Sequence, residues 1–210
     1  MKWTLLLLAA LVRPLVGVGD DYLSKVALYQ TDSYYKQKVY AEKDRAAFYI
    51  LSDLNKPVDP QNYDLHLLNA AMFYATNKQR AAKGVPELKY NASLRDAATL
   101  HTHQMIEKNF FDHFNSKNRK YYSPEKRFKL FGLEPPASAE NIDYTYLEEE
   151  GSTTYLQLAE AIVKDLYDSP AHRKNMLSKA YNSLGCAVMF EQKERDGNWY
   201  CKATQDFGSL

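Results

Sequence analysis

The C-terminal stretch of the chain constrains the fold most, because it has the pattern of two β-strands joined by a loop. The run SLGCAVMFE is followed by the polar loop QKERDG and then by NWYCKATQDF. Two apolar runs separated by a short polar loop are typical of antiparallel neighbours in a sheet. The fold is therefore expected to contain a sheet that includes this hairpin.

Helical periodicity precedes the hairpin in three places. Apolar residues recur at helical spacing in residues 65–75, 94–105 and 155–166. Gly84 is suited to end the first of these helices and Asn91 to cap the second. Several helices combined with a small antiparallel sheet predict an α+β fold or a layered αβα arrangement.

The organisation of the chain is that of one domain behind a leader. Its 210 residues, 45% of them hydrophobic, suffice for one good core. Residues 1–19 have the pattern of a secretory signal peptide, with Lys2, an apolar run and small residues at the end, although a retained apolar anchor is the alternative. Arg13 and Pro14 make the run too short for a membrane span. We expect an N-terminal helical extension and linker over residues 20–62 and the main domain over residues 63–210.

The charge of the chain excludes some partners. It carries 27 basic and 26 acidic side chains, so no basic field for nucleic acid or an anionic membrane is expected. No later window has the length of a transmembrane segment. Together with the leader, this predicts a secreted, periplasmic or extracellular protein.

The two cysteines, Cys186 and Cys201, lie in the two strands of the hairpin. They would form a disulfide if the register placed them opposite each other, and an exported protein would retain that bond. Two buried free thiols are the alternative. Either role is structural.

The segment LYDSPAHRKNML raises a functional question about its histidine. Ser169 suits a helix N-cap and Pro170 the first helical position, so a short helix is expected to restart there. His172 then lies near a helix N-terminus, which lowers the pKa of an imidazole. A neutral imidazole suits a metal or a hydrogen-bonding ligand, but it could equally bond a nearby carbonyl.

Two further candidates lie at the ends of predicted elements. His113 occurs in NFFDHFN, whose phenylalanines are expected to pack inward, and Glu140 occurs in PPASAENIDY, where a strand begins. If His113, Glu140 and His172 converge, they form a ligand set that suits zinc or another divalent metal with an open position.

The order of these motifs resembles a known family. NFFDHFN, SAENI, DLYDSPAHRKNML, SLGCAVMF and ATQDFG follow one another as in the CAP superfamily of cysteine-rich secretory proteins, antigen 5 and pathogenesis-related proteins. The similarity covers residues 65–208 and is greatest to the bacterial secreted branch. It implies a three-layer αβα sandwich with a surface cleft.

The resemblance also implies which residues line that cleft. In animal and fungal members, two histidines and two glutamates line it, and His113 and Glu140 match the first of each. The second glutamate falls at Ser169 and the second histidine at Lys202. His172 belongs to the Ser-Pro-x-His-Arg motif of bacterial relatives. Zinc is therefore expected to bind weakly or not at all.

Four other polar residues receive assignments. The family position of Gln205 implies that it faces the cleft. Arg173 is a cleft candidate that could pair with a carboxylate, although a structural bond to a carbonyl is the simpler reading. Asp206 suits a strand-end cap or an ion pair, and His101 suits a hydrogen-bonded core position.

Two classes of function remain. The resemblance implies a non-enzymatic binding module for a small ligand, such as a lipid, a sterol or an envelope fragment. The alternative is a hydrolase that uses a metal or the His and Glu side chains on extracellular substrates. The sequence has no HExxH or GxSxG pattern, and Ser169 is expected to be used as a helix cap. Binding is therefore favoured over catalysis.

Overall fold

The structure is a computed structural model that describes residues 32–147, 151–191 and 194–210. In this part of the chain, helices flank a four-stranded sheet with the strand order β1-β3-β4-β2. The strands are β1 (Lys89–Tyr90), β2 (Ser138–Tyr146), β3 (Ser183–Phe190) and β4 (Tyr200–Gly208). The main helices are α5 (Leu65–Ala82), α6 (Ala92–Glu107), α7 (Pro124–Leu130), α8 (Tyr155–Asp168) and α9 (Pro170–Leu177).

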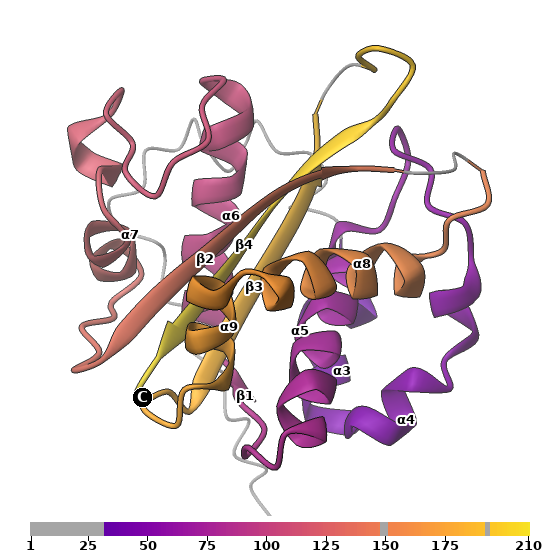
Figure 1. Cartoon of the computed structure of the whole chain (residues 1–210), viewed down its shortest axis with the longest axis horizontal. Helices are drawn as coiled ribbons and strands as arrows, with labels where there is room; N and C mark the ends of the chain where they lie inside the picture. The colour runs from indigo at the N-terminus through magenta and orange to yellow at the C-terminus, as the bar shows by residue number, and fades with distance from the viewer. Residues whose placement is uncertain (1–31, 148–150, 192–193) are drawn as a thin grey trace, which may run out of the picture.

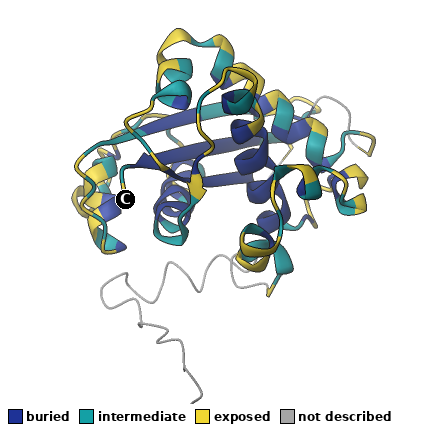
Figure 2. Cartoon of the chain, turned by 90° about the horizontal axis from the view of Figure 1, so that it is seen from below, coloured by how far each residue is buried: buried dark blue, intermediate teal, exposed yellow. Residues whose placement is uncertain are grey.

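The sheet is the middle of three layers (Figure 1), with α6 and α7 on one side and α5, α8 and α9 on the other. Thr102 of α6 shares a 2.7 Å hydrogen bond with Thr204 of β4. The next residue of β4, Gln205, donates to Thr76 of α5 at 2.7 Å. Because successive strand residues point to opposite faces, these two bonds tie the layers together. The strands at the centre are buried (Figure 2), and the predicted α+β sandwich is confirmed.

Side-chain caps set where the helices begin. Asp64 accepts hydrogen bonds from the backbone N–H groups at the start of α5, and Asn91 caps α6 as expected. Thr154 and Gln157 form a capping box at α8. Ser169 behaves differently. It precedes α9, and Pro170 takes the first helical position as expected, but the Ser169 hydroxyl makes no capping bond, so that part of the prediction is wrong.

The hairpin forms as predicted, but its cysteines do not meet. β3 and β4 pair antiparallel, with Cys186 opposite Gln205 and Cys201 opposite Phe190. The thiols are therefore offset by four residues, which at about 3.4 Å per residue is roughly 13 Å along the strand, beyond the reach of a disulfide. Both cysteines are free and buried, so the expected disulfide is wrong.

Short helices at residues 34–55 pack against α5. They are η1 (Tyr34–Lys36), α3 (Lys38–Glu42), α4 (Arg45–Tyr49) and η2 (Ser52–Asn55). Val39, Phe48 and Leu54 are fully buried and join the same apolar core as α5 and α8. The segment is therefore held by burial of apolar surface, while the domain division at residue 62 stays a prediction.

The expected signal peptide at residues 1–19 lies outside the described residues. Among the helices that are described, none combines the length and apolar character needed to cross a membrane.

Candidate functional site

A histidine and a glutamate from distant parts of the chain meet at one edge of the sheet. His113 follows α6, and Glu140 lies on β2, which is an edge strand. The Nδ1 atom of His113 is 2.9 Å from Oε1 of Glu140. The imidazole is 39% exposed, whereas the carboxylate is 1% exposed. The inner nitrogen of the ring is thus bonded to a buried carboxylate, and Nε2 bonds to no described residue.

Arg127 of α7 holds the other oxygen of Glu140. Its Nη2 donates to Oε2 of Glu140 at 2.6 Å and to the carbonyl of His113 at 3.1 Å. Its Nη1 donates to the carbonyl of Tyr121 at 3.0 Å. Because a guanidinium is planar and keeps its charge, these bonds fix both the carboxylate and the loop that carries His113.

The start of α7 and one apolar contact aim Arg127 at this point. Ser123 caps the helix, and Pro124 takes its first position. Phe128, the residue after Arg127, is buried against Leu94 and Leu100 of α6. Burial of this aromatic ring anchors a helix of only seven residues.

Two more ionisable side chains lie behind Glu140. His101 Nε2 is 3.6 Å from Oε1 of Glu140, and Asp206 of β4 is directly opposite Glu140 in the strand register. Both are fully buried. Among the described residues, no donor bonds to the carboxyl oxygens of Asp206, and the ring nitrogens of His101 have no hydrogen-bond partner. Such orphaned groups are costly and concentrate at functional sites.

Burial separates the protonation states of these groups. Burial, and then repulsion from Glu140, raise the pKa of Asp206 well above its ordinary value. Burial lowers the pKa of His101 to about 4. Burial opposes ionisation of Glu140 too, but His101 and Arg127 bring its pKa below the ordinary value. The two shifts are opposite, so as pH rises Glu140 ionises before Asp206, and Asp206 keeps its proton to a higher pH.

The pKa of His113 shifts in the opposite direction to that of His101. Its hydrogen bond to Glu140 raises its pKa above the ordinary 6.5, although partial burial works against this. The bond therefore increases the share of imidazolium near neutral pH, and the imidazolium has an N–H at the outer nitrogen.

A hollow of about 280 Å³ opens over this imidazole. It is lined by His113, Phe114, Pro124, Glu125, Ser138, Ala139, Glu140 and Asn175. Phe114 is 48% exposed and packs on Tyr122, and Phe111 is 45% exposed. The expectation that the phenylalanines of NFFDHFN all pack inward is therefore wrong for these two: Phe114 lines the hollow, and Phe111 packs on Tyr144 at the surface.

His172 lies close to this hollow without bonding to it. The side chain of Asn141 donates to the carbonyl of His172 at 3.1 Å and accepts from Asn175 at 2.9 Å, which holds α9 against β2. Burial, and then the charge of His113, lower the pKa of His172. Its imidazole is thus near enough to sense His113 and is expected to be neutral.

Two other candidates are directed away from the hollow. Gln205 is fully buried on the α5 face, where it donates to Thr76 and accepts from Asn141 at 3.0 Å. The expectation that Gln205 faces the cleft is wrong, because its neighbour Asp206 takes that face. Arg173 donates to the carbonyl of Tyr167 at 3.0 Å and stacks on its ring, as the structural reading predicted.

The ligand set expected for zinc is not assembled. Within the described residues, no group of three or more His, Cys, Asp or Glu side chains is arranged to hold a metal ion. The oxygens of Glu140 are already bonded to His113 and Arg127. At Lys202, the family position of the second histidine, the ammonium donates to the carbonyl of Met105 at 3.0 Å. These residues do not fit a resident metal.

Sequence reasoning missed Arg127 and the partnership of His101 and Asp206 with Glu140. The signal for α7 was available, because Ser123-Pro124 repeats the Ser-Pro start seen at α9. No pattern in the sequence pointed to the pairing of Asp206 with Glu140, which depends on the register of β2 on β4.

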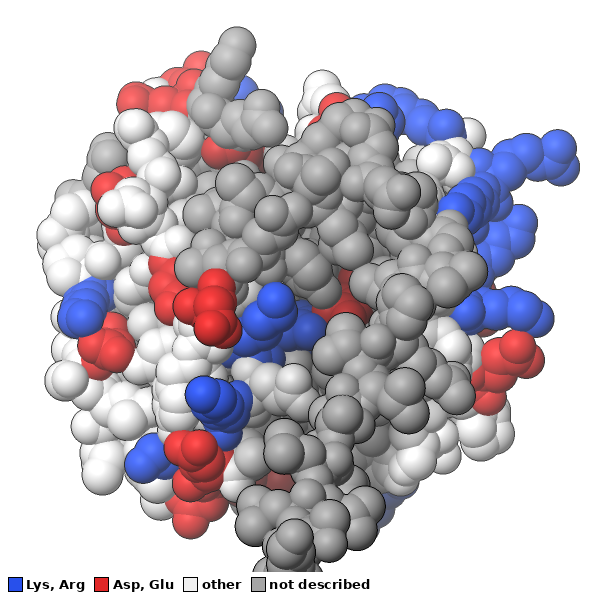
Figure 3. Space-filling model, turned by 180° about the vertical axis from the view of Figure 1, so that it is seen from behind, with Lys and Arg blue, Asp and Glu red and all other residues white. Residues whose placement is uncertain are grey.

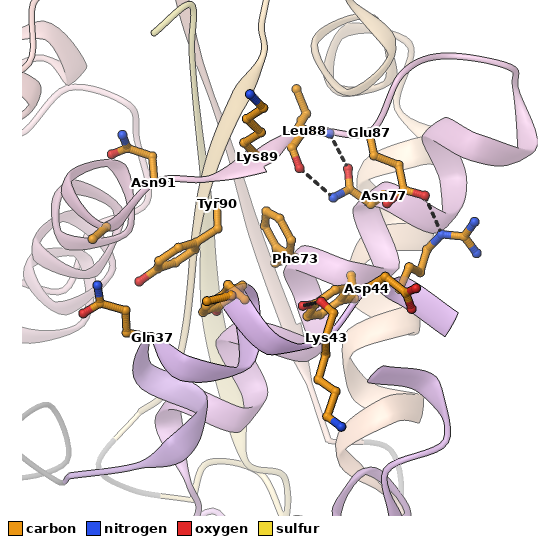
Figure 4. Close-up of a pocket in the computed structure, with 15 residues that line it drawn as sticks. Gln37, Lys43, Asp44, Phe73, Asn77, Glu87, Leu88, Lys89, Tyr90 and Asn91 are labelled. Atoms are coloured by element: carbon orange, nitrogen blue, oxygen red, sulfur yellow. Dashed lines mark hydrogen bonds and ion pairs between the residues drawn. The ribbon is translucent and has the colours of Figure 1, made fainter. Parts of the chain in front are cut away.

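A second hollow, of about 490 Å³, lies between the N-terminal segment and β1 (Figure 4). Several of its polar groups are bonded to each other. Arg45 pairs with Glu87 at 2.8 Å, and the amide of Asn77 exchanges two hydrogen bonds with the backbone of Leu88. We interpret this hollow as the packing seam of the segment.

Comparison with known families identifies the architecture. The model of the cysteine-rich secretory protein family, CAP, matches residues 73–203. The chain belongs to the CAP family. The matched span includes His113, Glu140 and His172, and it ends before Asp206, so the buried partner of Glu140 lies beyond the family match.

Two curated relatives of this chain are longer than it is. YkwD, an uncharacterized protein of Bacillus subtilis strain 168, is 31% identical over 110 residues, which cover 52% of this chain and 38% of the relative. YlbC, an uncharacterized membrane protein of the same strain, is 25% identical over 191 residues, 84% of this chain and 50% of the relative. This CAP chain therefore spans half or less of the length of these relatives.

Solved structures agree with the CAP fold. An extracellular protein with an SCP domain from Bacillus anthracis has a TM-score of 0.54 at 20% identity, covering 73% of this chain and 45% of that one. An outer surface protein from Borrelia burgdorferi has a TM-score of 0.52 at 13% identity, covering 74% of this chain and 98% of that one. At these identities the likeness concerns the fold alone.

Proposed function

We propose that this CAP protein is an extracellular binding module that holds a small amphiphilic ligand at the His113 hollow without breaking a bond in it. The observation that carries the proposal is the partly exposed imidazole of His113, whose inner nitrogen is fixed by buried Glu140. An imidazolium fixed in this way donates a charge-assisted hydrogen bond, which favours a carboxylate or phosphate group on the ligand.

A hollow of mixed apolar and charged lining, with Lys129 and Glu134 in its wall, lies beside the first and leaves room for the tail of a ligand. It measures about 420 Å³, includes Phe128, Leu133 and Pro135, and shares Glu125 and Ser138 with the His113 hollow. Small-molecule sites are commonly of this size, apolar with a few polar groups that orient the ligand. The pair of hollows suits an acyl lipid whose acidic head contacts His113.

The surrounding charge favours the same head group. Lysine and arginine side chains gather on the side of the molecule that carries η3 (Arg119–Tyr121) and α7 (Figure 3). The exposed ones on these elements are Arg119, Lys120, Lys126 and Lys129. These four cations outnumber Glu125 and Glu134, the exposed acids that line the two hollows, so the local potential attracts an anionic ligand to the mouth. The chain as a whole is near neutral, so this attraction is local.

An extracellular location is supported by the expected leader and by relatives. The structural neighbours from Bacillus anthracis and Borrelia burgdorferi are described as an extracellular and an outer surface protein.

The hydrolase alternative has less support. A general base requires a nucleophile within hydrogen-bond reach. In the described part of the chain, the ring of His113 bonds to Glu140 and to no serine, threonine or cysteine side chain.

Calorimetric titration with dodecyl phosphate and dodecanol tests the proposal. We expect dodecyl phosphate to bind at least about tenfold more tightly, because a hydrogen bond to a charged group contributes about 1.5–3 kcal/mol. His113→Gln should remove this preference, and His103→Gln, outside the hollow, should retain it. Equal affinity for the two ligands, or an unchanged preference in His113→Gln, would contradict binding at this site. Release of dodecanol from dodecyl phosphate would instead favour the hydrolase.

A further inference from the structure

The edge of the sheet opposite β1 is open at its far end. Leu147 N donates to Trp199 O at 2.8 Å, in the register that pairs β2 with β4. Hydrogen-bonded pairs alternate along an antiparallel ladder, so odd-numbered residues of β2 bond to β4. Tyr144 and Tyr146 therefore direct their backbone N–H and C=O groups away from β4, and β2 pairs with no other described strand.

The Tyr144–Tyr146 end of this edge lacks the usual protection against pairing. Natural edge strands are commonly blocked by proline, by lysine or by a bulge. The sequence of β2 is SAENIDYTY, without proline or lysine, and its pairing with β4 is continuous over all nine residues. Tyr146 at its end is 45% exposed. The end of β2 therefore has the features of a strand that accepts another.

A hollow lies on one side of this edge. It measures about 630 Å³ and lies between Thr145 and Tyr146 of β2 and one side of α8, including Gln157, Leu158, Ala161, Lys164 and Asp165. α8 runs beside β2 (Figure 1). Edge and helix thus bound a groove that is wide enough for side chains of a peptide.

The groove offers one exposed carboxylate. Asp165 of α8 lines the hollow and is exposed. Lys164, the cation that also lines it, is bonded to Asp168 at 2.6 Å. Asp143 of β2 has a buried oxygen, Oδ2, without a hydrogen-bond partner. Burial, and then the charge of Asp165, raise the pKa of Asp143 to about 7. A cationic side chain in the hollow would offset this repulsion.

The other side of the same edge is aromatic. Tyr144 lies 5.7 Å from Phe111 and 5.5 Å from Tyr200, and Tyr146 lies 5.8 Å from Tyr200, between ring centroids. Arg195 covers the ring of Tyr200 at 4.1 Å. Phe111 is 45% exposed. This face offers a broad apolar surface to a neighbouring side chain.

We propose that the Tyr144–Tyr146 edge of β2 binds an extended peptide as an added strand. Successive side chains of a strand point to opposite faces, so one lysine or arginine enters the hollow beside Asp165 and the adjacent aromatic side chain lies on Phe111, Tyr144 and Tyr146. The main-chain bonds supply affinity, and the two side-chain sites supply specificity. This site is separate from the His113 hollow and does not depend on its ligand.

Fluorescence anisotropy with a labelled six-residue probe that alternates lysine and tyrosine tests the proposal on the full chain. Three matched peptides separate the contributions: one with glutamate for lysine, one N-methylated at the tyrosines and one N-methylated at the lysines. An antiparallel added strand bonds to β2 through the amides of the residues that lie on the aromatic face, the tyrosines, whereas a parallel strand uses the lysines. We expect glutamate to abolish binding and one methylated set, but not both, to weaken it at least tenfold.

Variants of the chain give an independent readout. Proline at an outward-facing edge position removes a donor while leaving the ladder with the inner strand intact. Tyr146→Pro should therefore weaken binding more than Tyr146→Ala. Thermal unfolding curves should show that both variants are folded. Asp165→Asn should weaken binding roughly twofold to fivefold, as expected for an exposed ion pair, and Glu134→Gln, far from the groove, should have no effect.

Two outcomes would overturn the proposal. Equal tolerance of both methylated peptides, or equal loss in Tyr146→Pro and Tyr146→Ala, would show that no strand is added. The chain could also self-associate in a way that Tyr146→Pro abolishes and that the probe peptide does not disrupt. That result would show that the edge pairs with a second copy of the chain.

Discussion

Glu140 and Asp206 lie directly opposite each other on β2 and β4, and both carboxyl groups are buried. Their pKa values move apart, because Arg127 pairs with Glu140, whereas burial and the charge of Glu140 raise the pKa of Asp206. The raised pKa of Asp206 identifies it as the group that keeps the proton. The floor of the His113 hollow is thus a carboxylate bonded by an arginine and a histidine, with Asp206 opposite it in the strand register.

Asp206→Asn is expected to change how stability depends on pH. In the unfolded chain Asp206 ionises near 3.8, whereas in the folded chain its pKa is raised well above that value. Between these pKa values the folded state binds more protons, so the free energy of unfolding falls as pH rises, by at most about 1.4 kcal/mol per pH unit. Asp206→Asn removes this pH-dependent fall in the free energy of unfolding.

Urea unfolding of both proteins at pH 5, 6, 7 and 8 measures the effect. The stability of Asp206→Asn relative to the unmodified chain should increase steadily with pH until the folded-state pKa is passed. A difference that stays constant over this range would mean that Asp206 is ionised in the fold.

Arg127→Met is expected to destabilise the protein by about 3–5 kcal/mol, because it leaves the buried charge of Glu140 without its partner. Adding Glu140→Gln should recover part of this loss, since the uncompensated charge is then gone. Chemical unfolding of the two single variants and the double variant gives the coupling between the residues. Additive losses would show that the pair is not coupled.

The helices and the hairpin were predictable because local signals fixed them. Asn91 caps α6, Pro170 starts α9, and apolar spacing marked α5 and α8. The seven-residue α7 was missed because Phe128 is one of only two buried residues in it, the other being Arg127. A single apolar residue gives no periodicity to detect.

The site was less predictable because it depends on register. His113 and Glu140 were candidates at the ends of predicted elements and also matched the family motifs, and the two residues do meet. Asp206 rather than Gln205 reaches Glu140 because a strand alternates its faces, and sequence alone left that parity open. The sequence also left the register of β3 on β4 open. In the structure, an offset of four residues separates Cys186 from Cys201.

Gly185 of β3 is expected to tolerate no side chain. A Cβ there would lie 2.0 Å from the backbone nitrogen of Arg95 and 2.2 Å from the carbonyl carbon of Leu94, so α6 would have to move off the sheet. Gly185→Ala should therefore cost more than about 3 kcal/mol or prevent folding.

Gly208→Ala is the matched control. A Cβ at Gly208 would lie 3.4 Å from a flexible Leu94 methyl group, so its midpoint of thermal unfolding should stay within a few degrees of the unmodified chain. Equal stability of the two alanine variants would contradict the close approach of α6 to β3.

The two thiols are expected to be unreactive in the folded protein. Burial raises the pKa of both Cys186 and Cys201, which suppresses the reactive thiolate. Iodoacetamide should modify neither thiol in native buffer and both in urea, without a reducing agent, as counted by mass spectrometry. Two thiols that stay blocked in urea until reduced would reveal a disulfide and a different register.

The central claim is that buried Glu140 fixes His113 as a charged donor in the hollow, and NMR titration of the histidine ring protons tests it most directly. We predict that the pKa of His113 lies above 6.5 while that of His172 lies below it, and that Glu140→Gln lowers the pKa of His113. A His113 that titrates at or below 6.5, or one that is unaffected by Glu140→Gln, would contradict the claim.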